Sequence, residues 1–102
     1  MEIGGKEYKL GYPTRKDAIR AEDEGLNLLE GKVLKLQSKL FYGGLKSYDP
    51  EMTEEKSDEL LDKYINEGGD MEEVNTFLST QYSNFIKPQV VKKTKKMKIV
   101  TE

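Results

Sequence analysis

The stretch from Val33 to Tyr48, VLKLQSKLFYGGLKSY, constrains the fold most, because it is the densest apolar segment of an otherwise polar chain. Its apolar residues recur at helical spacing, and one face of that helix would hold Leu34, Phe41, Leu45 and Tyr48. A second stripe beside this face holds Val33, Leu36, Leu40 and Gly44. Such a wide apolar arc predicts a central helix, beginning near Glu30, with neighbours on more than one side.

The pair Gly43-Gly44 interrupts this helical pattern. Each glycine inside a helix destabilises it by about 1 kcal/mol relative to alanine. Close approach of another helix or of a partner chain would compensate, because glycine has no side chain to hold two backbones apart. The alternative is that the helix bends or ends at the pair. The sequence favours neither interpretation over the other.

Composition indicates one folded domain that lacks the groups most enzymes use. The 102 residues include 24 Leu, Ile, Val and Phe with a net charge of only −2, which is unlike a disordered chain. Cysteine and histidine are absent, which excludes disulfides, Cys/His zinc sites, cysteine nucleophiles and histidine acid–base catalysis. No apolar run approaches the roughly 20 residues that span a membrane, and no signal peptide is evident. We therefore expect a soluble, cytoplasmic protein with no membrane partner.

The small net charge conceals an uneven distribution along the chain. Residues 1–87 carry 12 basic and 18 acidic side chains, whereas residues 88–102 carry 5 basic and 1 acidic. We therefore divide the chain into a helical domain, residues 1–88, and a lysine-rich tail, residues 89–102. A flexible basic arm is favoured for the tail over an extended strand that pairs with the N-terminal hairpin.

Local signals predict a β-hairpin at the N-terminus. Gly4-Gly5 can supply the positive φ angles of a two-residue turn. After it, Tyr8, Leu10 and Tyr12 alternate with polar residues or glycine, as in a half-buried strand, and Pro13 ends that strand. An isolated hairpin is marginally stable in water, so we expect it to pack on helices.

Three further helices are predicted from their N-capping residues, which are Thr14, Thr53 and Asp70. The first helix would run from Arg15 to about Glu24, with Ala18, Ile19 and Ala21 as its apolar residues. The next would use an apolar stripe of Leu60, Leu61, Tyr64 and Ile65. The last would end before Pro88 and has the clearest stripe: Met71, Val74, Phe77, Leu78, Gln81, Tyr82, Phe85 and Ile86. The predicted fold class is therefore mainly α (α+β), about four helices with an N-terminal β-hairpin and a basic C-terminal tail.

Three blocks of sequence, in their order and spacing, resemble a known family: IGGKEYKLGYPTR at 3–15, LFYGGLKSYDPEMTEE at 40–55 and LLDKYINEGGDMEEV at 60–74. The resemblance is to the small tail assembly chaperones of long-tailed phages and prophages of Gram-positive bacteria. It implies a non-enzymatic protein of the bacterial host cytoplasm. Such a protein would bind the tape measure protein and help recruit tail tube protein subunits. The tail after Pro88 lies beyond the matching region.

Candidate protein-binding residues come from the central helix and from the tail: Tyr42, Gly43, Gly44, Tyr48, Lys92, Lys93, Lys95 and Lys96. Tyrosine is frequent at binding hot spots, although both tyrosines also suit the edge of a core. The tail lysines could contact an acidic partner, contact the acidic body of the chain itself, or only aid solubility. They could also contact nucleic-acid phosphates, but the acidic body argues against nucleic acid as a partner.

No pattern for a catalytic, metal or cofactor site is evident. The acidic residues between Glu51 and Asp62 lack the spacing and the turn glycine of a calcium-binding loop, so they are typical of a solvated helix surface. The glycine pairs match no phosphate-binding motif. We therefore expect no enzyme, no metal and no cofactor; a homo-oligomer is possible. The alternative function is that of a small nucleic-acid-associated regulatory protein that uses the basic C-terminal tail.

Overall fold

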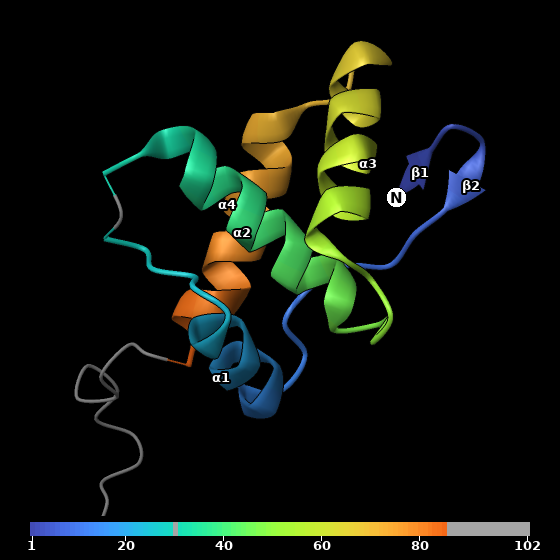
Figure 1. Cartoon of the computed structure of the whole chain (residues 1–102). Helices are drawn as coiled ribbons and strands as arrows, with labels where there is room; N and C mark the ends of the chain where they lie inside the picture. The colour runs from blue at the N-terminus through green and yellow to red at the C-terminus, as the bar shows by residue number, and fades with distance from the viewer. Residues whose placement is uncertain (30, 86–102) are drawn as a thin grey trace, which may run out of the picture.

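A computed structural model describes residues 1–29 and 31–85, and within them the chain forms a two-stranded hairpin followed by four helices (Figure 1). The elements are β1 (Glu2–Ile3), β2 (Lys6–Glu7), α1 (Arg15–Asp23), α2 (Val33–Lys46), α3 (Glu54–Asn66) and α4 (Met71–Ser83). The mainly helical fold with an N-terminal hairpin is as predicted. The tail lysines, Ile86 and Pro88 lie outside the described residues.

The hairpin turns at Gly4 and Gly5, whose φ angles of 61° and 80° favour glycine. Its strands pair antiparallel, with Ile3 opposite Lys6. The prediction that the second strand extends through Tyr12 is wrong, since β2 ends at Glu7. After β2 the chain leaves its partner strand β1 and packs against the helices instead. There the Gly11 N–H donates a hydrogen bond of 3.0 Å to the Gly44 carbonyl on α2.

The predicted N-caps are confirmed at α1, α3 and α4. Thr14, Thr53 and Asp70 each accept a hydrogen bond from the backbone N–H three residues later, at 3.3, 3.1 and 3.1 Å. Helix α2 differs, because its N-cap residue, Lys32, makes no side-chain cap and its first turn holds no acidic residue. It begins at Val33 rather than near Glu30, after a short irregular connection from α1.

The core surrounds the C-terminal half of α2. Leu40, Phe41 and Leu45 keep 2%, 0% and 1% of their surface exposed. Helix α2 contacts α1, α3 and α4, and β1 packs on α3. The other buried apolar residues come from every element except β2 and from the connecting segments: Ile3, Tyr12, Ala18, Ala21, Leu26, Tyr42, Met52, Leu60, Leu61, Val74, Leu78 and Tyr82.

The glycine pair is the point of closest packing on α2. A Cβ at Gly43 would collide with the Tyr12 hydroxyl and lie 3.2 Å from the Ala21 Cβ, and one at Gly44 would lie 2.9 Å from a Leu78 methyl. The Tyr12 hydroxyl donates a hydrogen bond of 2.7 Å to the Leu40 carbonyl. Helix α2 continues to Lys46, so the glycine pair does not end the helix. The space beside both glycines is occupied by neighbours within the chain and not left open for a partner chain.

Several apolar residues that the helical pattern assigned to the core are exposed instead. On α2, Val33 and Leu34 keep 72% and 78% of their surface, and Tyr48 lies beyond the helix. On α1 the buried residues are Ala18 and Ala21, while Ile19 faces solvent. Ile65 and Phe77 are also exposed. The common cause is that neighbouring elements cover each of these helices over only part of its length or of its circumference.

A candidate protein-binding surface on helix α2

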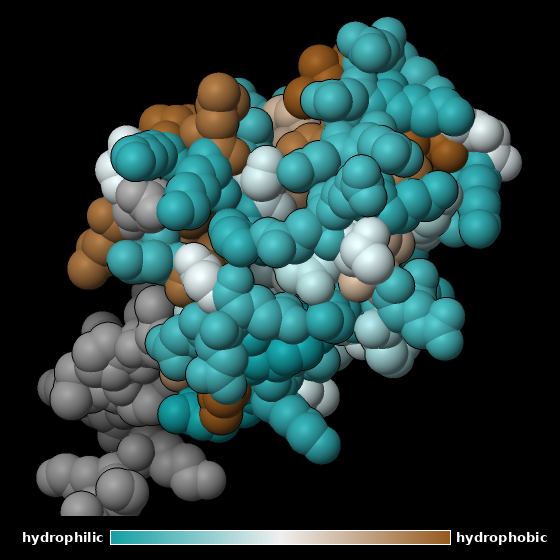
Figure 2. Space-filling model, viewed as in Figure 1, coloured by the Kyte–Doolittle hydropathy of each residue, from teal (hydrophilic) through white to brown (hydrophobic). Residues whose placement is uncertain are grey.

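Exposed apolar side chains concentrate at the N-terminal end of α2 and in the connection before it. Leu29, Val33 and Leu34 keep 92%, 72% and 78% of their surface exposed, the three largest values among the described large apolar residues. We call these three residues the apolar ridge. Figure 2 shows apolar side chains gathered over this end of α2. Contiguous exposed apolar residues mark interaction sites more often than scattered ones do.

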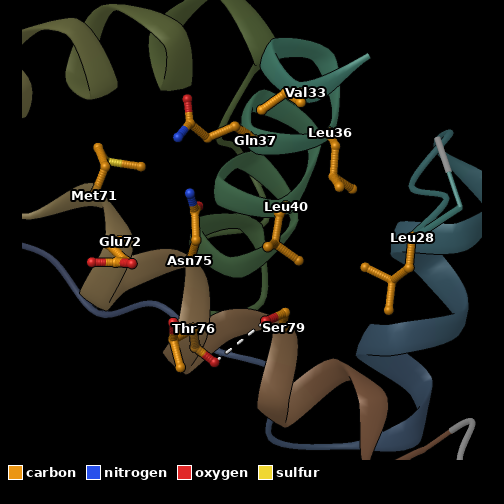
Figure 3. Close-up of a pocket in the computed structure, with 10 residues that line it drawn as sticks. All are labelled: Leu28, Val33, Leu36, Gln37, Leu40, Met71, Glu72, Asn75, Thr76 and Ser79. Carbon is orange, nitrogen blue, oxygen red and sulfur yellow. Dashed lines mark hydrogen bonds between the residues drawn. The ribbon is translucent and has the colours of Figure 1, made fainter. Parts of the chain in front are cut away.

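A groove runs beside the ridge between α2, α4 and the end of the α1–α2 connection, and its volume is about 450 Å³. We call it the α2–α4 groove; its lining residues are Leu28, Val33, Leu36, Gln37, Leu40, Met71, Glu72, Asn75, Thr76 and Ser79. In Figure 3 the leucines line the side toward α1, and polar side chains of α4 line the other. The surface is therefore an apolar floor with a polar wall that includes one carboxylate, Glu72.

Two polar groups in the groove wall are available to a bound molecule. Glu72 is exposed, and among the described residues it is the one charged side chain that lines the groove. Oδ1 of Asn75 is buried without a hydrogen-bond partner among the described residues. A buried polar atom without a partner destabilises a structure by about 1–3 kcal/mol. A donor from a bound partner would relieve that cost.

The charged side chains on and next to α2 are all basic. Residues 31–48 contain Lys32, Lys35, Lys39 and Lys46 but no carboxylate side chain. Lys39 forms an ion pair with Glu54, and Lys46 forms one of 2.8 Å with Glu24. Hydrogen bonds to Glu24 and then to Tyr42 raise the pKa of Lys46. Lys35 lies exposed in the first turn of α2, beside the apolar ridge.

The binding residues predicted from the sequence are not part of the apolar ridge, and those on α2 are buried. Tyr42 is 8% exposed and its hydroxyl accepts a hydrogen bond of 3.0 Å from Lys46, while Gly43 and Gly44 are buried. Only Tyr48 reaches the surface, where its ring lies under the Lys9 ammonium at 5.9 Å from the centroid. Lys92, Lys93, Lys95 and Lys96 lie outside the described residues. The glycine pair therefore offers no surface to a partner in this structure.

Tyr48 belongs to a second hollow of about 770 Å³, on the side of the hairpin. Four aromatic rings contribute to it, from four parts of the chain: Tyr8, Tyr48, Tyr64 and Phe77. Lys6 and Lys9 already lie over two of these rings, Tyr8 and Tyr48. Lysines of the chain itself thus already contact two of the four rings, and the apolar ridge, which is more exposed, is the stronger candidate.

Sequence reasoning missed the apolar ridge because it assigned those residues to the core or to a connector. The signal was present in the first turn of α2. The other three helices each have a capping side chain and an acidic residue in the first turn. At α2, Lys32 at the N-cap position and Lys35 in the first turn accompany the apolar residues, and there is neither a capping side chain nor an acidic first-turn residue.

Within residues 1–29 and 31–85 no group of three or more acidic side chains is arranged to hold a metal ion. None of the helices in the described part of the chain has the length and apolar character needed to cross a membrane. No protein-family model, no curated protein and no solved structure matches this chain.

Proposed function

We propose that this chain is a non-enzymatic tail assembly chaperone of a long-tailed phage or prophage, acting in the host cytoplasm. It would bind the tape measure protein and help recruit tail tube subunits. The observation that carries the proposal is the apolar ridge with its groove, an uncovered apolar surface on a small helical domain. The partner's identity rests on the resemblance of three sequence blocks to this family.

The geometry suits binding of a helix. The α2–α4 groove lies between two helices, and an amphipathic helix commonly docks its apolar stripe in such a groove. Val33 of the apolar ridge lines this groove, and a docked helix would cover it. Uncovering them again on release would return the chain to its starting state, as a chaperone that leaves the finished tail requires.

The test is co-expression of the full chain with the tape measure protein of the same phage or prophage. We expect the two to copurify, and Leu34→Asp to abolish copurification because a charge would enter the apolar contact. Ile19→Asp is the matched control, since it alters an apolar residue that is 48% exposed on α1, outside the groove lining.

Failure of the wild-type chain to copurify would overturn the proposal. So would equal loss with both variants, because binding would then not depend on the ridge. A gel retardation assay at two salt concentrations tests the nucleic-acid alternative; salt-sensitive retardation of DNA or RNA, without copurification of the tape measure protein, would favour that alternative.

A further inference from the structure

The polar side chains of the α2–α4 groove are nearly unused within the chain. Five of them line the groove: Gln37 from α2, and Glu72, Asn75, Thr76 and Ser79 from α4. Among the described residues, only Ser79 forms a side-chain hydrogen bond, of 3.4 Å to the Thr76 carbonyl, drawn as the dashed line in Figure 3. The Asn75 Oδ1 atom is also buried, so it lacks water as well as a protein donor among these residues. The groove wall therefore offers unused polar groups to a bound molecule.

Two of these groups are acceptors on one face of α4. Glu72 and Asn75 are three residues apart, so they lie on the same side of the helix, about 4.5 Å apart along its axis. An ionised carboxylate accepts hydrogen bonds and donates none, and the same holds for the oxygen of an amide. Glu72 forms no ion pair within the described part of the chain. Both groups therefore require a donor from outside.

The charge on this wall of the groove is negative. Residues 64–85, which include all of α4, hold four acidic side chains and no basic one. The lysines of α2 are not among the residues that line the groove, and Lys39 and Lys46 have carboxylate partners elsewhere. A cationic donor therefore complements the α4 wall, and an anionic group does not.

We propose that the α2–α4 groove binds an amphipathic helix of another protein whose apolar stripe is bordered, on the side that faces α4, by arginine or lysine. The apolar stripe would cover Val33 and the leucines of the floor, and the cation would donate to Glu72 and Asn75. Arginine suits this pair best, because its fork of five N–H donors can reach two acceptors at once. The inference rests on the proposed function, in which the tape measure protein supplies that helix, and it specifies the chemistry of the segment that binds.

Two other occupants fit the groove less well. A second copy could offer its own apolar ridge with the lysines beside it, but only Val33 and Leu34 of the ridge belong to a helix, whereas the α4 wall from Glu72 to Ser79 is two turns long. Residues 89–102 of the chain itself are basic, but six of these 14 are the β-branched residues valine, isoleucine and threonine, which disfavour a helix. A basic amphipathic helix of a different chain satisfies both the length and the chemistry of the groove.

Two designed helical peptides provide the probe. They share one apolar stripe, and the positions along one border of that stripe are arginine in the first peptide and glutamate in the second. Each peptide is labelled with a dye and titrated with the full chain, and fluorescence anisotropy gives the dissociation constant. We expect the arginine peptide to bind at least about 10-fold tighter at low ionic strength, because it gains a charged donor at both acceptors while the glutamate peptide is repelled.

The adjacent glutamates of α4 supply a matched pair of variants. Both Glu72 and Glu73 are exposed in the first turn of α4, but only Glu72 lines the groove. Glu72→Gln should weaken binding of the arginine peptide by about 2- to 5-fold, the range of an exposed ion pair. Glu73→Gln should leave that affinity nearly unchanged. The melting temperatures of the two variants should change equally, because each loses one negative charge beside the same helix N-terminus.

Asn75→Leu separates recognition from folding. The variant should bind the arginine peptide about 10-fold more weakly, because it loses a hydrogen bond to a charged donor. Its melting temperature should stay the same or rise, because the buried oxygen without a partner is gone. A residue that only supports the fold would show the opposite combination, a lower melting temperature and an unchanged affinity of the folded chain.

Four results would overturn the inference. The first is equal affinity for the two peptides, and the second is equal loss of affinity in Glu72→Gln and Glu73→Gln. The third is a dimer of the free chain that the arginine peptide dissociates, since a second copy would then occupy the groove. The fourth is a gain of about 10-fold or more in affinity when the full chain carries Lys92→Glu and Lys93→Glu, since its own C-terminal residues would then compete for the groove.

The same measurements keep this inference apart from the proposed function. Preferential binding of the arginine peptide, without copurification of the tape measure protein, would overturn the proposed function alone. Copurification that Leu34→Asp abolishes, without a preference between the two peptides, would overturn this inference alone.

Discussion

The two halves of α2 share one sequence pattern but lie in opposite environments. In the C-terminal half, residues 40 to 45 are all buried, including both glycines. In the N-terminal half, residues 33 to 35 are all exposed although two of them are Val33 and Leu34. One helix therefore forms both the centre of the core and the most apolar part of the surface.

The difference shows that helical periodicity identifies the apolar residues that share a face of the helix. It does not identify which of them neighbouring elements bury. Coverage depends on where neighbouring helices end. The glycine pair lets Tyr12 and Leu78 approach the C-terminal half closely, whereas Leu34 stays 78% exposed among the described residues. The first half therefore depends on something outside the described fold to bury its apolar residues. Such a division is what a binding helix anchored in a core requires.

The largest test of the comparison is Phe41→Ala in the buried half. Phe41 is fully buried, so the change should lower the free energy of unfolding by about 3–5 kcal/mol. A domain of this size has a total stability of roughly 5–15 kcal/mol, so much of it would be lost. Urea denaturation measures the effect, and an unchanged midpoint would contradict the burial of this ring.

The next test adds a methyl group at the closest packing point. Gly43→Ala improves helix propensity, but the new Cβ would collide with the Tyr12 hydroxyl, which is held by its bond to the Leu40 carbonyl. Overpacking of this kind should lower stability by about 1–3 kcal/mol. Gly31→Ala is the control, because open space surrounds that position and the change should not destabilise. Stabilisation by Gly43→Ala in thermal denaturation would show that the packing is loose.

A third test uses pH at the buried half. Burial raises the pKa of Tyr12, so the folded state holds the hydroxyl proton more tightly than the unfolded chain does. The stability that this contributes is complete below the unfolded tyrosine pKa of about 10 and decreases as pH rises above it. Tyr12→Phe should cost about 1 kcal/mol at neutral pH through the lost hydrogen bond, and should flatten the decline above pH 10. An equal decline in both proteins would exclude Tyr12 as its source; Tyr82, whose pKa burial also raises, would be the next candidate.

Local chemistry was predictable from sequence, and coverage was not. Thr14, Thr53 and Asp70 cap helices because each acts through a hydrogen bond three residues away. The partner of Gly43 is Tyr12, more than thirty residues earlier in the chain, and no periodicity reveals it. For the same reason the sequence left Tyr42 open between a binding surface and the edge of the core, where the structure places it, and it assigned to the core Leu34, which is exposed.

The smallest expected effect is the sharpest test of the comparison. Leu34→Ala removes the same atoms as Leu45→Ala on the same helix, but Leu34 is 78% exposed and Leu45 is 1% exposed. Leu45→Ala should lower the unfolding free energy by about 2–5 kcal/mol, because it leaves a cavity in the core. Leu34→Ala should change it by less than about 0.5 kcal/mol, because its side chain gains little burial on folding. Urea midpoints of the two variants measure the contrast. If Leu34→Ala destabilised the free chain as much as Leu45→Ala, the first half of α2 would already be covered in solution, and the ridge would not be available to a partner. If it left stability unchanged but weakened partner binding, burial of the ridge would belong to the complex rather than to the fold.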